Sequence, residues 1–154
     1  MDKAKRLVDA LREMGKTVAT AESCTGGLIG KRITDVPGSS NVYPGGVISY
    51  SCEIKRRVLG VDPAVLEAQG AVCEAVAAQM AEGVRALMGS DYGLSTTGVA
   101  GPDSDDFGNP VGLVYLGLTD GVHTKVLELH LTGDRAVIRR KAAERALSAF
   151  FDLI

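Results

Sequence analysis

Apolar and polar residues recur along this chain at two spacings, and glycine, proline or aspartate stands at most changes from one spacing to the other. An apolar residue every three or four positions is typical of a helix with one buried face, whereas short runs of β-branched and aromatic residues are typical of strands. The predicted helices cover residues 2–14, 27–34, 52–59, 64–69, 73–88 and 135–153. The predicted strands cover residues 16–20, 45–51, 92–97, 111–119 and 124–131.

The order of these elements predicts the fold class. The first three strands are separated by helices, which are the long crossover connections that parallel strands need. The last two strands flank Asp120 and Gly121, a pair that is typical of a tight hairpin turn. We therefore predict a three-layer α/β fold with a mixed, mainly parallel sheet, helices on both faces and a late antiparallel hairpin. A length of 154 residues fits a single domain over residues 1–154.

Composition and charge exclude several classes of protein. Hydrophobic residues make up 45% of the chain and charged residues 23%, as in globular domains. The net charge of -2 and the lack of a lysine or arginine block argue against a nucleic-acid partner. The start does not resemble a signal peptide, and no apolar run approaches membrane-spanning length. Because the three cysteines are odd in number and lack paired spacing, we expect a reducing, cytoplasmic location without a membrane partner.

Metal binding is not expected from this sequence. His123 and His130 are the only histidines, and the acidic segment 103–109 lacks the ligand spacing of a calcium loop. This segment is therefore predicted to be a solvated, mobile rim rather than a metal site.

Most of the candidate catalytic and binding residues lie between residues 20 and 55. Ser23, Thr25, Gly26 and Gly27 form a small-residue turn between a predicted strand and a predicted helix. Backbone N–H groups at the helix start, together with the two hydroxyls, could hold an anion. A plain helix cap fits the same residues equally well.

Further polar groups are expected to face the same cleft. Ser40 lies in a second tight turn, Tyr50 lies near the end of the strand that follows, and Lys55 lies about one helical turn past that strand. Taken singly, these residues have ordinary interpretations as a turn serine, a strand aromatic and a solvated lysine. The glycine-rich turn that starts at Gly98, just after Thr97, is another place where a ligand could approach the backbone closely.

In order along the chain stand the motifs AESCTGG, DVPGSS, GGVISYS followed by Lys55, GVAGP, PVG and TGDR. Together these motifs resemble the CinA carboxy-terminal domain family, and the resemblance covers nearly the whole chain. It implies a small-molecule nucleotide substrate: hydrolysis of the amide of nicotinamide mononucleotide, without a cofactor, to nicotinic acid mononucleotide and ammonia in pyridine nucleotide salvage. It also implies a stand-alone form of the domain and a homo-oligomer.

The resemblance further implies catalytic roles. Matching the motif positions makes Ser40 the nucleophile, Lys55 its base and Tyr50 the group that relays or orients the proton. Lysine can serve as a base only if its pKa is lowered, since an ordinary lysine is protonated at neutral pH. Ser23 and Thr25 remain open as substrate-binding residues or as alternative nucleophiles.

Substrate-binding roles follow from the same match. Arg135, at a predicted helix start, would bind the phosphate with its planar guanidinium, and Thr97 would line the site. Backbone N–H groups of Gly26, Gly27 or Gly98 would form the oxyanion hole.

Other features of the motifs qualify this interpretation. Cys24 ranks below both serines as a nucleophile, since no histidine is near it in the sequence. The segment 103–109 differs from the family, in which a glycine pair and a lysine are frequent there, so substrate affinity is expected to differ. The alternative function is a non-catalytic nucleotide-binding or protein-interaction module of the same family.

Overall fold

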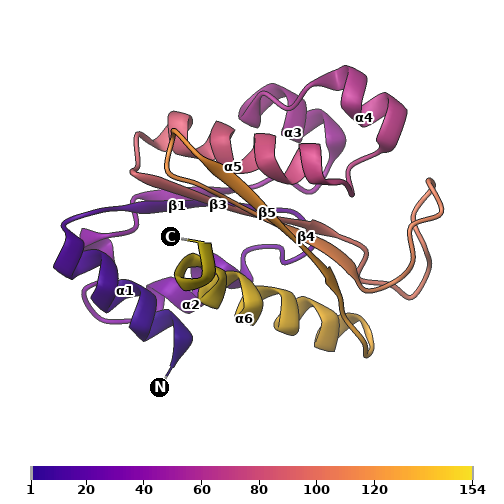
Figure 1. Cartoon of the computed structure of the whole chain (residues 1–154). Helices are drawn as coiled ribbons and strands as arrows, with labels where there is room; N and C mark the ends of the chain where they lie inside the picture. Colours follow the sequence, from indigo (N-terminus) through magenta and orange to yellow (C-terminus); the bar gives the residue numbers. More distant parts are fainter. Residues whose placement is uncertain (1, 154) are drawn as a thin grey trace.

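The structure, a computed structural model, describes residues 2–153, and each predicted helix and strand is present in it (Figure 1). The helices are α1 (Lys3–Met14), α2 (Leu28–Thr34), α3 (Cys52–Leu59), α4 (Pro63–Gln69), α5 (Glu74–Met88) and α6 (Arg135–Leu153), with a short 3₁₀ helix, η1, at Ser39–Asn41. The strands are β1 (Val18–Glu22), β2 (Gly45–Ile48), β3 (Tyr92–Gly98), β4 (Leu113–Thr119) and β5 (Thr124–His130).

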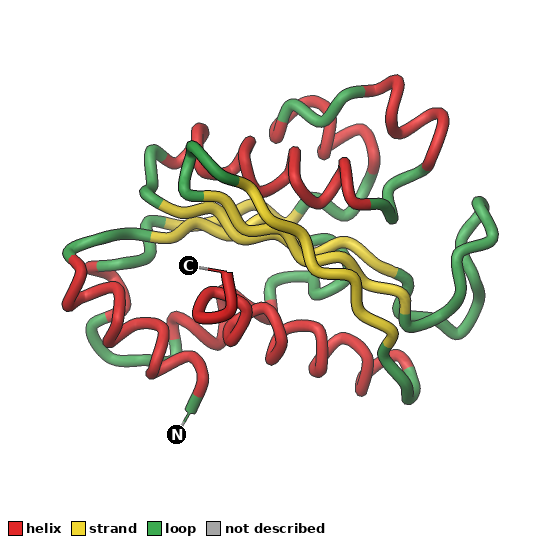
Figure 2. Tube along the Cα trace, viewed as in Figure 1, coloured by secondary structure: helices red, strands yellow, loops and turns green. Residues whose placement is uncertain are grey.

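Within residues 2–153 the strands form one mixed sheet in the order β2-β1-β3-β4-β5 (Figure 2). β1 pairs in parallel with β2 on one side and with β3 on the other. β3 pairs antiparallel with β4, and β4 pairs antiparallel with β5. The α/β class, the mixed sheet and the late hairpin are therefore confirmed, with the parallel strands first in the chain and the antiparallel ones last.

Helices cover both faces of the sheet, as predicted. α5 lies against one face with α3 and α4 on the same side, and α1, α2 and α6 lie on the other side (Figure 1). The larger core cluster lies between the sheet and α1, α2 and α6, and includes Leu7, Ile29 and Phe150. A second cluster around Met80 joins α5 to the sheet. Among the described helices, none has the length and apolarity that a membrane span requires.

The limits of two strands bear on the site. β1 is buried along its whole length and continues through Glu22, beyond residue 20 where it was predicted to end. β2 ends at Ile48, earlier than predicted, because the Ser51 side chain accepts a hydrogen bond from Ile54 N at 3.2 Å and so caps α3. Tyr50 therefore lies in the short connection between β2 and α3.

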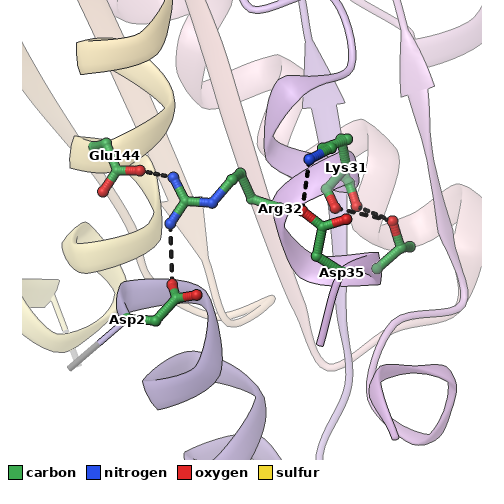
Figure 3. A network of polar contacts seen from close by, with 7 residues as sticks. Asp2, Lys31, Arg32, Asp35 and Glu144 are labelled. Atoms are coloured by element: carbon green, nitrogen blue, oxygen red, sulfur yellow. Dashed lines mark hydrogen bonds and ion pairs between the residues drawn. The ribbon is translucent and has the colours of Figure 1, made fainter. Parts of the chain in front are cut away.

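Ion pairs join α2 to the two helices beside it (Figure 3). Arg32 on α2 pairs with Asp2, the N-cap residue of α1, at 3.0 Å, and also with Glu144 on α6. Lys31 and Asp35 form a further pair at 2.7 Å, but both side chains are largely exposed, so this pair contributes little to stability. The partly buried Arg32 thus fixes the position of α2, which follows the turn after β1.

Candidate active site

A cavity of about 480 Å³ opens at the edge of the sheet where the parallel strands end. Its walls come from the turn after β1, the connection after β2, the end of β3 with the loop after it, and the start of α6. The carboxyl ends of parallel strands are the usual place for a ligand site in an α/β sheet. The predicted residues that line this cavity are Ser23, Tyr50, Lys55, Thr97, Gly98 and Arg135, and those that do not are Ser40, Thr25, Gly26 and Gly27.

Lys55 and Ser23 form the central contact of the cavity. Lys55 is only 1% exposed, and its Nζ donates to Ser23 Oγ at 2.8 Å. Nζ also donates to the main-chain oxygens of Ser49, at 2.7 Å, and of Tyr50, at 3.3 Å. Among the described residues no carboxylate pairs with this amine. Burial lowers the pKa of Lys55, because the charged amine loses its hydration and gains no opposite charge.

The local structure fixes both partners of this contact. Ser23 N donates to Thr96 O on β3 at 3.0 Å, and Ser23 O accepts from Gly26 N at 3.1 Å. Lys55 lies on the buried face of α3, one turn before the buried Leu59. A serine hydroxyl thus meets a buried amine within hydrogen-bonding distance, which is the arrangement of a nucleophile and its base.

Ser40 does not lie near Lys55 within the chain. It belongs to η1, which precedes β2, and Val42 O just after η1 accepts from Val18 N, at the start of β1, at 2.8 Å. Ser23 follows the opposite end of β1. The predicted pairing of Ser40 with Lys55 is therefore corrected: Lys55 contacts Ser23, the alternative nucleophile, because parallel strands place the segment before β2 and the segment after β1 at opposite edges of the sheet.

Tyr50 and Arg135 contact each other on another wall of the cavity. Tyr50 is 64% exposed, and its phenol oxygen accepts from Arg135 Nη2 at 3.1 Å. Arg135 Nη1 donates to Gly101 O at 2.7 Å. The phenol thus orients the guanidinium, and within the described residues it forms no hydrogen bond with Lys55 Nζ or a serine hydroxyl. The guanidinium has further N–H groups with which to bind an anion.

Thr97 and Gly98 shape the cavity wall at the end of β3. Thr97 Oγ1 donates to Ala71 O at 2.8 Å, so this hydroxyl already has an acceptor within the protein. A Cβ atom on Gly98 would lie 2.6 Å from Val114 Cγ2, so no side chain fits there. Both residues therefore limit the shape of the cavity.

The anion that was predicted at the start of α2 is a carboxylate of the chain itself. Glu22, at the end of β1, is 2% exposed. Its carboxylate accepts hydrogen bonds from Thr25 Oγ1 at 2.7 Å and from the N–H groups of Gly27, Ile29 and Gly30 at 3.2, 2.8 and 3.0 Å. The donors expected to bind a ligand are therefore already occupied.

The predicted binding roles of Thr25, Gly26 and Gly27 are corrected accordingly. The Thr25 hydroxyl and the Gly27 N–H bond to Glu22, and the Gly26 N–H bonds to Ser23 O. Since these groups are used inside the turn, they hold Ser23 in place and do not face the cavity.

Cys24 lies next to Ser23 and lines the cavity. Burial raises the pKa of its thiol to about 11, so the thiol is protonated at neutral pH and is a poor nucleophile. This supports the lower rank of Cys24 as a candidate nucleophile.

The acidic segment 103–109 contributes Asp105 and Asp106 to the cavity wall. The Asp105 carboxylate accepts from the N–H groups of Phe107, at 3.0 Å, and Asn109, at 2.8 Å, which folds the segment back on itself. No group of three histidine, cysteine, aspartate or glutamate side chains in residues 2–153 could hold a metal ion. The segment that was predicted to be a rim thus contributes two carboxyl side chains to the cavity wall.

Arg139 is a residue that the sequence prediction missed. It lies on α6, and its Nε and Nη2 donate to Cys24 O at 3.0 Å and Thr25 O at 3.2 Å. Its spacing of four residues from Arg135 was the available signal, because residues at this spacing lie on the same side of a helix.

The family model for the CinA C-terminal domain matches residues 1–154. A CinA-like protein of Acidobacterium capsulatum is 47% identical over 137 residues, which cover 89% of this chain and 33% of that protein. The chain thus spans about a third of the length of the curated relatives it matches.

Solved structures share both fold and sequence with this chain. The competence/damage inducible protein CihA of Agrobacterium tumefaciens is 35% identical, with a TM-score of 0.93, and the match covers 98% of this chain and 93% of that one. The competence damage-inducible protein A (ComA) of Klebsiella pneumoniae is 32% identical, with a TM-score of 0.95, and the match covers 98% of this chain and 94% of that one. The likeness therefore extends over nearly the whole chain.

Proposed function

The chain belongs to the CinA C-terminal domain family, and on that premise we propose that it is a nicotinamide mononucleotide deamidase, which hydrolyses the carboxamide to give nicotinic acid mononucleotide and ammonia. The observation that carries this proposal is the contact of the buried Lys55 amine with Ser23 Oγ, at 2.8 Å, in a cavity of about 480 Å³. Amide hydrolysis needs a nucleophile and a base in contact. A cavity of this size is typical of sites for small molecules.

In the proposed reaction Ser23 takes the role first assigned to Ser40. Neutral Lys55 accepts the hydroxyl proton of Ser23 as Oγ attacks the amide carbon to form a tetrahedral intermediate. Lys55 then gives this proton to the amide nitrogen, which leaves as ammonia, and an ester remains on Ser23. Finally Lys55 deprotonates a water molecule that attacks the ester, and nicotinic acid mononucleotide leaves while the Ser23 hydroxyl is restored.

The main-chain oxygens around Lys55 support its role as the base. A neutral amine has two N–H groups and one lone pair. If the oxygens of Ser49 and Tyr50 accept the two N–H groups, the lone pair is directed at the Ser23 hydroxyl. After the proton transfer the third N–H donates to the substrate side, and the two oxygens still hold the amine in place.

Arg135 is the proposed partner of the substrate phosphate. Its guanidinium is held by Gly101 O and the Tyr50 phenol, so its remaining N–H groups have a fixed direction. A guanidinium matches phosphate oxygens in charge and in planar geometry. With the phosphate at Arg135, the carboxamide of the mononucleotide would lie toward Ser23 and Lys55 across the cavity.

Ammonia release from nicotinamide mononucleotide tests the proposal and also separates the two serines. We expect the wild-type protein to release ammonia, and Ser23→Ala and Lys55→Ala to lose at least about a thousandfold in kcat, as is usual when a nucleophile or its base is removed. Ser40→Ala is the matched comparison, and its turnover should stay within about threefold of the wild type.

Other results would lead to different conclusions. If Ser40→Ala loses turnover while Ser23→Ala keeps it, the serine assignment reverses. If the wild-type protein binds the mononucleotide, as measured by calorimetry, but releases no ammonia at any pH, the non-catalytic binding module replaces the enzyme.

A further inference from the structure

Arg139 joins the last helix to the residues that follow the proposed nucleophile. It lies one helical turn after Arg135, and its side chain donates to Cys24 O at 3.0 Å and to Thr25 O at 3.2 Å. Both carbonyl groups belong to the turn after Ser23. The arginine is partly buried and makes no ion pair among the described residues, so these two oxygens are its partners in the fold.

The planar peptide group links these carbonyl directions to the directions of N–H groups. In a trans peptide the C=O and the following N–H point in opposite directions. When Cys24 O points at Arg139, the Thr25 N–H therefore points away from Arg139. When Ser23 O accepts from Gly26 N at 3.1 Å, the Cys24 N–H points away from the interior of the turn. Within residues 2–153 neither the Cys24 N–H nor the Thr25 N–H donates a hydrogen bond to another residue.

The turn leaves space for this arginine. Gly26 has a φ of 59°, which favours glycine, and a Cβ atom there would lie 2.9 Å from Arg139 Nη2. A larger residue would thus strain the backbone and displace the guanidinium. Since Ser23 and Cys24 both line the cavity, the backbone that Arg139 holds also borders the cavity.

We infer that Arg139 is a positioning residue, which holds the turn after Ser23 so that the N–H group of Cys24, a residue that lines the cavity, is an oxyanion-hole donor. This inference rests on the proposed function and supplies its missing element, a donor for the developing negative charge. The N–H of the residue after the nucleophile has this role in other serine hydrolases. Arg139 itself stays behind the turn and does not touch the substrate.

The test compares Arg139→Ala with Arg140→Ala, a neighbouring exposed arginine on the same helix. Oxyanion donors act on the transition state and not on substrate binding, so kcat of Arg139→Ala should fall roughly 10- to 100-fold while KM stays within about twofold. Added guanidine should restore part of this kcat, and Arg139→Lys should lose less than Arg139→Ala. Arg140→Ala should match the wild type.

A second readout does not depend on the mononucleotide. A fluorophosphonate probe reacts when Ser23 Oγ attacks phosphorus and fluoride leaves, and its phosphoryl oxygen needs the same N–H donor. Arg139→Ala should therefore react more slowly than Arg140→Ala by a factor similar to the loss in kcat. If the wild type reacts with the probe but releases no ammonia, the proposed function fails, and the labelling rates still decide the inference.

Several results would overturn the inference. Equal turnover and equal labelling in the two arginine variants would do so. A rise in KM without a fall in kcat would also do so, because it would place Arg139 in substrate binding. A loss that matches the fraction of unfolded protein in circular dichroism, and that guanidine does not restore, would reduce Arg139 to a stabilising contact.

Discussion

Two buried ionisable side chains lie at the end of β1, and their surroundings are opposite in kind. Glu22 ends the strand, and Lys55 contacts the next residue, Ser23. The Glu22 carboxylate accepts from one hydroxyl and three main-chain N–H groups. Among the described residues the Lys55 amine has only neutral oxygens as partners. Consecutive residues of extended chain point to opposite sides, so each group occupies its own side of the strand end.

This difference gives the two groups different roles: the Glu22 carboxylate is structural, and the Lys55 amine is the proposed base. The Glu22 carboxylate accepts from four donors and so holds the start of α2 against the sheet. An amine that is buried among neutral oxygens is disfavoured as a cation, and this is why burial lowers the pKa of Lys55. Glu22 thus gives the turn its shape, while Lys55 is the proposed base.

The largest expected effect comes from removing the Glu22 carboxylate. Glu22→Ala leaves its four donors without their acceptor in a buried place, and unsatisfied buried donors cost about 1–3 kcal/mol each before water compensates. We expect the free energy of unfolding, measured by urea denaturation, to fall by roughly 3–5 kcal/mol. Glu53→Ala, at an exposed position on α3, is the control and should change it by less than about 0.5 kcal/mol. Similar losses in both variants would contradict the comparison.

The proposed role of Lys55 as a base should be visible in the pH dependence of kcat/KM. Only neutral Lys55 can accept a proton, so kcat/KM should rise about tenfold per pH unit while the amine is protonated, and then level off. Because burial lowers the pKa of Lys55, this levelling should come below pH 10.5, the ordinary value for lysine. A kcat/KM that still rises with pH above 10.5, or that falls as the pH rises toward 10.5, would remove Lys55 from the role of base.

The same lowered pKa predicts a change in stability, with a definite sign. Below its pKa in the folded protein, Lys55 is charged in both states, and its burial costs stability in full. Between that pKa and 10.5, the value in the unfolded chain, the unfolded state binds more protons, so the contribution of Lys55 to stability rises with pH. The unfolding free energy of the wild type should therefore increase relative to Lys55→Met as the pH rises through this window. A constant difference would contradict the lowered pKa.

The smallest expected effect concerns Tyr50. Tyr50→Phe removes one acceptor from Arg135, which keeps its hydrogen bond to Gly101 O. One hydrogen bond at an exposed position is worth about 0.5–1.5 kcal/mol, so KM for the mononucleotide should rise roughly 2- to 10-fold with little change in kcat. A large fall in kcat would instead support the proton-relay role that the family resemblance implies for Tyr50.

Much of the fold could be predicted because the turn residues in the sequence stand where the helices and strands of the structure begin and end. Glycine or proline marks most helix and strand limits, and Asp120 with Gly121 marks the hairpin. The position of Lys55 was also predictable, since a residue one helical turn after a parallel strand lies at the carboxyl edge of the sheet. Tyr50 and Arg135 meet at this edge for the same reason.

The order of the elements distinguishes Ser23 from Ser40, and motif matching does not use this order. Ser40 precedes β2, whereas Ser23 follows β1, and parallel strands place these two positions at opposite edges. The order of the elements therefore already favoured Ser23 as the partner of Lys55.

Other parts of the site depend on contacts that no local pattern encodes. Glu22 reaches the start of α2 because β1 continues further than its β-branched residues indicate. Arg139 contacts Cys24 across 115 residues of sequence, and such a pair is fixed only when the last helix packs on the sheet.

The two arginines of α6 are four residues apart, which corresponds to about 6 Å along a helix axis. One of them contacts Tyr50 and the other contacts the main chain beside Ser23. Because α6 is a rigid helix, it fixes the distance between these two contacts. It therefore also fixes the distance between the two ends of a molecule that binds along them. Substitutions at the far end of α6, around Phe150, would therefore alter both contacts in concert, by sliding or tilting the whole helix.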